Sequence, residues 1–406
     1  MLNLSARGQD ALFNSASLDQ TTAARTAQFS TQPYVGPVQF GLGANAGVTY
    51  DDNVNSSQVN PESDVLTQTG INVSLNWPAT DASDLQFGTS IGYVNYERQV
   101  SNSGLEISPD SALTYAISFY DVAVTFFDQL SYTRQVHTEA ALANITTLPQ
   151  LNNNIGLQSE WDPGHWVLSA SYSHDNTVSE HADDYLNHSA EDFVGRLGWR
   201  FAEATQAGME ASDTLTAYQV SSLYNSANLS VGGYLDWQVQ PSLTVTLGGG
   251  PVFYMPEFAG PAGANGSQDT YYVNASISHQ LTDYLSHSLS VNRSLQAGLN
   301  QGGSYIEQLT AAYAIHWQLT QRIGVSVSAN YVDGQQPFAT SGGASGVFLA
   351  STVENYDQYG GGFQISWKIT DHLSTTLNYN HLERTSNLSG RDYSDDQIGL
   401  QLNYTF

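Results

Sequence analysis

Apolar and polar residues alternate along most of the chain from about residue 38 onward. Between Val38 and Tyr50 the even positions are apolar, whereas the odd positions are Gln, Gly, Asn or Thr. A period of two is the pattern of a β-strand, because successive side chains of a strand point to opposite faces. The same alternation recurs in Ile71 to Trp77, Leu113 to Phe119, Leu229 to Trp237, Ile323 to Tyr331, Leu373 to Tyr379 and Ile398 to Phe406. The pattern predicts an all-β protein.

The polar face of these segments consists almost entirely of Asn, Gln, Ser, Thr and Gly. A soluble sheet usually carries Lys and Glu on the face that meets water. A transmembrane barrel instead turns an apolar face to lipid and a neutral polar face to a water-filled lumen. We therefore predict an antiparallel up-and-down transmembrane β-barrel.

About 18 strands fit between Val38 and Phe406, and a miscounted hairpin would give 16 or 20. The connections alternate between short ones, such as Asp162 to His165, and longer ones, such as Asp51 to Asp64. Outer-membrane barrels have short periplasmic turns and longer external loops. The predicted organisation is a barrel over residues 37–406, preceded by a periplasmic segment or lumen insert over residues 1–36.

All seven tryptophans lie beside the predicted short turns. Six end a strand just before such a turn, and the seventh opens the strand after one. Aromatic residues gather at membrane–water interfaces. We expect an aromatic girdle at one height of the barrel. Its members are Trp77, Trp161, Trp166, Trp199, Trp237, Trp317 and Trp367.

Composition excludes several classes of function. The 406 residues include only 11 basic but 38 acidic side chains, giving a formal net charge of -27, so we expect no nucleic-acid partner. The absence of Cys excludes disulfides, thiolate zinc sites and cysteine nucleophiles. The 24 Tyr, 15 Phe and 7 Trp argue against a disordered chain. No signal peptide is visible, and a mature form with its signal removed would look the same.

The first predicted strand reads Phe40-Gly-Leu-Gly-Ala-Asn-Ala-Gly-Val-Thr-Tyr-Asp-Asp-Asn. It resembles the opening strand of the beta-barrel porin 2 family, which is glycine-rich and ends in Tyr-Asp-(Asp/Ser)-Asn. The last segment, Ile398 to Phe406, resembles the terminal signal of outer-membrane barrels, with Tyr404 and Phe406 as its aromatic residues.

These resemblances imply a protein of the outer membrane of a Gram-negative-type bacterium. It would contact outer-membrane lipid and lipopolysaccharide and engage the barrel-assembly machinery through its C-terminal strand. Some barrels of this type are thought to export exopolysaccharide. The resemblance therefore implies a pore but leaves the cargo open.

Neither a catalytic nor a cofactor motif stands out. The chain contains no His-Glu-x-x-His motif, so we expect no enzyme activity and no cofactor. Asp51 and Asp52 form the tightest acidic cluster and are a weak calcium candidate, because Ca²⁺ prefers oxygen ligands. Solvated loop charge is the preferred interpretation of these two residues.

Several charged and aromatic residues fall on the lumen-facing register, since charges facing hydrocarbon are costly. The charges either favour cations in the channel or pair with one another in the wall.

Tyr120 is also expected to face inward, where such rings fill the lumen or stack on sugars. Asp128, in the apolar register, predicts a nearby bulge. The proposed lumen residues are Asp192, Arg196, Glu210, Tyr234, Asp236 and Tyr272.

The leading function is passive diffusion of small hydrophilic solutes, with tolerance for cations or sugars. The loop from Gly334 to Thr352 contains the apolar run Gly-Gly-Ala-Ser-Gly-Val-Phe-Leu-Ala. Three interpretations of this loop are left open: a constriction folded into the lumen, a contact with a partner, or a disordered loop. One alternative is an exopolysaccharide export pore with a periplasmic partner, and another is a structural surface-assembly barrel with an occluded lumen. A homo-oligomer is also left open.

Overall fold

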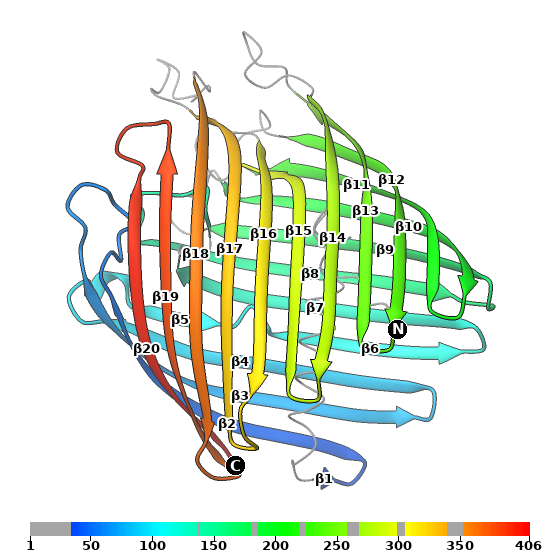
Figure 1. Cartoon of the computed structure of the whole chain (residues 1–406), viewed down its shortest axis with the longest axis horizontal. Helices are drawn as coiled ribbons and strands as arrows, with labels where there is room; N and C mark the ends of the chain where they lie inside the picture. Colours follow the sequence, from blue (N-terminus) through cyan, green and yellow to red (C-terminus); the bar gives the residue numbers. More distant parts are fainter. Residues whose placement is uncertain are drawn as a thin grey trace.

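The computed structural model describes residues 34–135, 139–179, 186–219, 225–257, 268–298, 305–338 and 352–406. These residues form one antiparallel sheet, and the pairing of β20 with β2 closes it into a barrel (Figure 1). Of 20 strands, β1 is a two-residue addition beside β2, and β5 and β6 share the position between β4 and β7. The wall therefore has 18 strands, which confirms the predicted fold and strand number.

The wall strands from the first half of the chain are β2 (Val38–Asp51), β3 (Asp64–Thr80), β4 (Ser83–Tyr96), β6 (Ala112–Phe119), β7 (Val122–Gln135), β8 (Thr147–Trp161), β9 (Trp166–Ser179), β10 (His188–Ala202) and β11 (Thr205–Tyr218). Those from the second half are β12 (Ser226–Gln240), β13 (Leu243–Pro256), β14 (Gln268–Thr282), β15 (Leu285–Ala297), β16 (Tyr305–Gln318), β17 (Ile323–Phe338), β18 (Thr352–Lys368), β19 (Leu373–Ser386) and β20 (Tyr393–Thr405). The additional elements are β1 (Tyr34–Val35), β5 (Gly104–Ile107) and the 3₁₀ helix η1 (Val100–Asn102).

The connections define two edges of the barrel. Eight turns of two to four residues join strands at one edge, which we call the short-turn edge. At the other edge, the long-loop edge, the connections have six residues or more. This is the predicted alternation of turns and loops. Of the predicted N-terminal segment, the structure describes only residues 34–36, where β1 pairs with the start of β2.

Alternate residues of each strand face opposite sides of the wall. On β10, Phe193 and Leu197 are 47% and 46% exposed, whereas Val194 and Arg196 are 5% and 7% exposed. The outer face carries large apolar side chains on nearly every wall strand, far more than a water-soluble surface exposes. A closed barrel with an apolar outer face and a polar inner face is the architecture of outer-membrane proteins, in agreement with the predicted localisation.

The seven tryptophans all lie on the outer face at the short-turn edge, where they are 41 to 51% exposed. Trp166 of β9 and Trp199 of β10 are cross-strand partners, and their rings meet edge-on with centroids 4.6 Å apart. Tyr404 and Phe406 extend the aromatic row beside β20, with ring centroids 5.0 Å apart. The described residues contain no helix long and apolar enough to cross a membrane.

Two sequence predictions about single residues are wrong. Tyr120 lies in the turn between β6 and β7, with a φ of 51° and a fully exposed ring, rather than on the inner wall. Pairing runs without a shift past Asp128, and the register shift in this hairpin lies between Thr133 and Gln135. Asp128 stays in the outer register because the Asn153 amide donates a hydrogen bond of 2.7 Å to its carboxylate.

Candidate channel lumen

One side of the inner wall, on β10 to β14, is packed with paired polar groups. Arg196 of β10 and Glu210 of β11 are cross-strand partners, and Arg196 Nε donates to Glu210 Oε2 at 3.0 Å. The Tyr272 hydroxyl donates to Glu210 Oε1 at 2.8 Å. The Arg196 guanidinium also lies over the Tyr234 ring, 3.8 Å from its centroid. Gly232 is required here, because the Tyr272 hydroxyl fills the space of a Cβ.

The structure thus brings together four of the six residues that the sequence assigned to the lumen. Asp236 lies beside this group, with the Gln206 amide 3.4 Å from its carboxylate. Asp192 lies further along β10 and accepts a hydrogen bond of 2.7 Å from the Thr214 hydroxyl. Two roles were predicted for these charges: to favour cations in the channel, or to pair with one another in the wall. Because Arg196 and Glu210 neutralise each other, the arrangement favours pairing in the wall.

Two cavities open on the inner wall of β17 to β20 and β2 to β5, and their lining is almost neutral. A cavity of about 400 Å³ follows β17 to β20, β2 and β3, and none of its lining residues is charged. Ser326, Asn378 and Gln401 are typical of this lining. A second cavity of about 270 Å³ lies against β2 to β5, where Glu106 is the one acidic lining residue. This part of the wall offers hydroxyl and amide groups to anything in the lumen.

The connection between β7 and β8 reaches across the barrel at the long-loop edge. We call residues 139–146 the crossing segment. The carbonyl oxygen of Ala140 accepts a hydrogen bond of 2.7 Å from Arg384 Nε. The carbonyl oxygen of Ala141 accepts from Gln336 Nε2 at 2.8 Å and from Arg391 Nη2 at 3.0 Å.

These contacts join distant parts of the wall. Six wall strands (β6, β4, β3, β2, β20 and β19) stand between β7 and β18 on one side, and nine (β9 to β17) stand between β8 and β18 on the other. The crossing segment therefore spans much of the width of the lumen at the long-loop edge.

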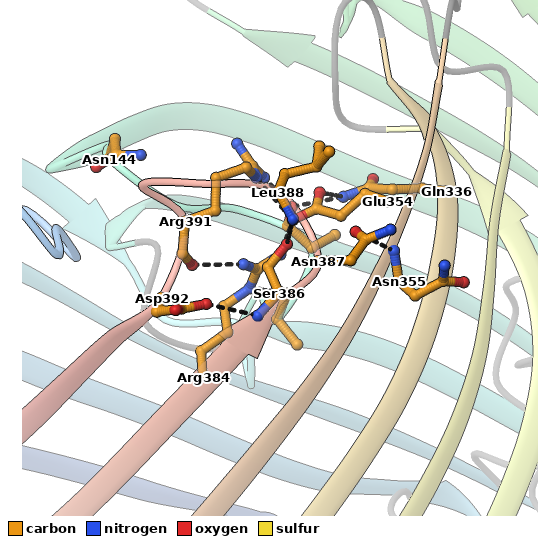
Figure 2. Close-up of polar contacts among 12 residues, drawn as sticks. Asn144, Gln336, Glu354, Asn355, Arg384, Ser386, Asn387, Leu388, Arg391 and Asp392 are labelled. Atoms are coloured by element: carbon orange, nitrogen blue, oxygen red, sulfur yellow. Dashed lines mark hydrogen bonds and ion pairs between the residues drawn. The ribbon is translucent and has the colours of Figure 1, made fainter.

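A buried carboxylate holds the side chains that bind the crossing segment. Glu354 of β18 accepts hydrogen bonds of 2.7 Å from Arg384 and from Arg391, and one of 2.8 Å from Gln336 (Figure 2). The Ser386 hydroxyl donates to the same carboxylate at 2.7 Å. Glu354 and Arg384 are completely buried. We call Gln336, Glu354, Arg384 and Arg391 the anchor.

Apolar packing supports the anchor. Ala140 and Ala141 are buried in a cluster with Ile306, Val332 and Tyr356 of the opposite wall. Further along the segment, Leu142 and Ile145 pack with Leu148 and Leu186 on the near side.

The end of the crossing segment is tied to two neighbouring loops. Asn144 Nδ2 donates to the carbonyl of Gly390 at 2.9 Å, and the Asn144 backbone N–H donates to the carbonyl of Ser56 at the same distance. The φ of Asn144 is 61°, a left-handed conformation that Asn tolerates better than most residues. The crossing segment is therefore fixed at both ends by hydrogen bonds.

Gly334 makes room for the wall side of this contact. The buried Tyr356 ring occupies the space that a Cβ on Gly334 would need. We expect Gly334→Ala to lower the free energy of unfolding by about 1–3 kcal/mol, as overpacking does in a tight core. Gly361→Ala is the matched control, since its Cβ would meet only a carbonyl oxygen at 3.9 Å. Urea unfolding in lipid vesicles compares the two, and equal stabilities would contradict this account.

The sequence pointed to a different loop as the constriction. Residues 339–351 of the proposed Gly334 to Thr352 loop lie outside the described residues. The crossing segment had its own signal, the apolar run Ala140-Ala141-Leu142-Ala143 in an otherwise polar connection. A second signal was the placement of Arg384 and Arg391, two of only 11 basic residues, in one hairpin.

The calcium candidate gains a third carboxylate. One oxygen each of Asp51, Asp52 and Asp395 lies within 4.8 Å of the others. Asp51 accepts a hydrogen bond from the backbone N–H of Asn53 at 2.9 Å, and Asp52 from that of Asp396 at 2.8 Å. Local hydrogen bonds thus account for the orientation of these two carboxylates, and calcium binding stays a prediction.

One Ser–His contact faces the lumen. His316 Nδ1 lies 2.9 Å from Ser326 Oγ, and Ser326 lines the larger cavity. A hydrolytic triad also needs a carboxylate or similar group to orient the imidazole. None of the residues that line this cavity is acidic. The contact therefore gives no reason to assign an enzyme activity.

No protein-family model matches the chain, and no curated protein matches it. The resemblance to the beta-barrel porin 2 family therefore stays a prediction. Many solved structures have a similar fold, and three of them serve as examples. OccK2 (OpdF) of Pseudomonas aeruginosa, in complex with glucuronate, has 9% identity and a TM-score of 0.48, over 92% of this chain and 99% of that chain. The outer membrane protein OpdK of the same species has 9% identity and a TM-score of 0.45, over 91% and 99%. OccAB2 of Acinetobacter baumannii has 9% identity and a TM-score of 0.47, over 90% and 98%.

Proposed function

We propose that this protein is an outer-membrane channel for passive diffusion of small hydrophilic solutes. The observation that carries the proposal is the neutral polar cavity of about 400 Å³ on the inner wall of a closed 18-strand barrel. Barrels of this strand number are wide enough to enclose an aqueous passage. No chemical step is part of the function.

Selectivity would come from two features of the lumen. The crossing segment narrows the external mouth, and the Ser, Asn and Gln side chains of the wall exchange hydrogen bonds with a solute that loses part of its hydration shell. Because Arg196 and Glu210 are paired, their two charges act little on the passage. Glu106 and the net charge of -27 favour cations weakly over anions.

The outer face supports an orientation. The tryptophan row marks the periplasmic interface, because it lies at the short-turn edge and short turns are periplasmic in outer-membrane barrels. The exposed rings of Tyr404 and Phe406 lie at the same edge, where the barrel-assembly machinery would recognise them. The crossing segment then faces the outside of the cell.

The crossing segment also favours one alternative function over another. A growing polysaccharide would have to displace a segment held by the buried anchor, so the described mouth does not favour polymer export. A barrel with an occluded lumen is the second candidate, because the same segment closes part of the mouth.

Liposome swelling tests the proposal. Vesicles with the folded barrel are placed in isotonic solutions of neutral sugars, from a pentose to a tetrasaccharide. We expect swelling for the small sugars and a steep decrease with sugar size. Folding is checked by the mobility shift of the unheated barrel in gel electrophoresis. A folded barrel that swells vesicles no faster than empty ones would contradict a channel and support the occluded barrel.

A further inference from the structure

The same cross-strand arrangement occurs on three hairpins of the long-loop edge. In each, a tyrosine on the first strand donates its hydroxyl to a carboxylate on the second strand at 2.6 Å. The cross-strand partner of each carboxylate is the residue two positions after the tyrosine. This partner is His174 for Glu191, Asp333 for Asp357 and His381 for Asp396. The three pairs are Tyr172 with Glu191, Tyr331 with Asp357, and Tyr379 with Asp396.

The pairs lie on the outer face of the barrel. Tyr172 and Tyr379 are exposed, and the side chains of Glu191 and Asp396 are 38% and 43% exposed. They share this face with exposed apolar residues of the same strands, such as Phe193. These groups therefore face the surroundings of the barrel and not its lumen.

The distance from the tryptophan row places the pairs in the membrane. Glu191 precedes Trp199 by eight residues, and Asp357 precedes Trp367 by ten. At about 3.3 Å per residue and a strand tilt of about 35–45°, these separations amount to roughly 19–27 Å along the barrel axis. The apolar band of an outer-membrane barrel is about 25 Å tall. The pairs therefore lie at the opposite boundary of the hydrocarbon, in the headgroup layer of the external leaflet.

The chemistry of the pairs limits what they contact there. A carboxylate repels a bare phosphate but accepts hydrogen bonds from hydroxyl and amide groups, and such charge-assisted bonds are strong. His174 and His381 hold two of the carboxylates at 2.9 Å, so that their orientation is fixed. The exposed Tyr172 and Tyr379 rings beside them offer flat faces to the C–H groups of a sugar ring.

We propose that the three tyrosine–carboxylate pairs bind the sugar headgroups of a glycolipid in the external leaflet. Each carboxylate accepts hydrogen bonds from hydroxyl or amide groups of the sugar, and the neighbouring rings pack against it. Because the pairs face away from the lumen, this interaction is independent of the proposed diffusion of solutes.

A triple variant, Glu191→Gln, Asp357→Asn and Asp396→Asn, removes the charges and keeps the shapes. The matched control changes three exposed aspartates of the short turns, Asp81→Asn, Asp121→Asn and Asp283→Asn, and so has the same net charge. Thermal unfolding is followed in phosphatidylethanolamine vesicles alone and with added lipid A, dephosphorylated lipid A or phosphatidylglycerol.

We expect both forms of lipid A to raise the unfolding temperature of the wild type and the control, and the triple variant to lose most of that gain. Phosphatidylglycerol should give no comparable gain. An equal gain in the triple variant would overturn the proposal. So would a gain that needs the lipid phosphates and disappears with EDTA, which would indicate phosphate bound through divalent cations. Sugar-driven swelling should be the same in all three proteins, so failure here leaves the channel proposal intact.

Discussion

The double variant Arg384→Ala, Arg391→Ala should have a single-channel conductance at least about twofold higher than the wild type. It removes two charge-assisted hydrogen bonds to the carbonyls of Ala140 and Ala141. Each such hydrogen bond contributes about 1.5–3 kcal/mol. Their loss therefore raises the equilibrium ratio of displaced to held crossing segment by roughly a hundred- to ten-thousandfold. A displaced segment widens the mouth. Conductance in planar bilayers measures the effect.

A thiol probe separates displacement of the segment from general unfolding. The chain has no Cys, so Ala141→Cys adds a unique and buried thiol. A membrane-impermeant maleimide should label it slowly in the intact barrel and at least about tenfold faster when the anchor arginines are replaced. Arg98→Ala, at an external loop arginine that donates to Ser63, is the control and should change neither measurement. Unchanged conductance and labelling in a folded double variant would contradict the crossing segment as a constriction.

The single substitution Arg196→Ala should lower the free energy of unfolding by about 3–5 kcal/mol. It leaves the Glu210 carboxylate buried without its ion-pair partner, and an uncompensated buried charge is costly. Replacing both residues by leucine should cost much less, because no isolated charge remains. Urea unfolding in vesicles measures these differences.

Arg200→Ala gives the matched comparison. The pair of Arg200 with Asp162 is about one-third exposed, so its loss should cost at most about 1 kcal/mol. The ratio of cation to anion permeability should stay the same when both Arg196 and Glu210 are replaced. A large change in that ratio with little loss of stability would show that these charges act on passing ions instead of stabilising the wall.

The architecture could be predicted because it is encoded locally. An alternation of period two, interrupted by turns, specifies which side of each strand faces lipid, and 18 such segments require a closed sheet in a membrane. The tryptophans fall at one edge because each sits next to its own short turn. None of these features depends on knowing which distant residues meet.

The mouth of the channel could not be predicted in this way. Ala140 meets Arg384 across 244 positions of sequence, and no local pattern indicates that pairing. Tyr120 shows the other limit, since it follows the last residue of β6 and leaves the wall where the strand ends. Counting alternate residues assigns a face only within a strand. An error of one residue in where the strand ends is enough to assign the wrong face or to assign a face to a turn residue.

The single-channel conductance of the wild-type barrel tests the central claim most directly. Purified, folded protein is added to a planar bilayer in concentrated potassium chloride, and the experiment is repeated with small and large neutral sugars present. We predict discrete conductance steps, a weak preference for potassium over chloride, and a decrease in conductance with sugars small enough to enter. A folded barrel that inserts but gives no steps, or steps that no sugar affects, would contradict a solute channel.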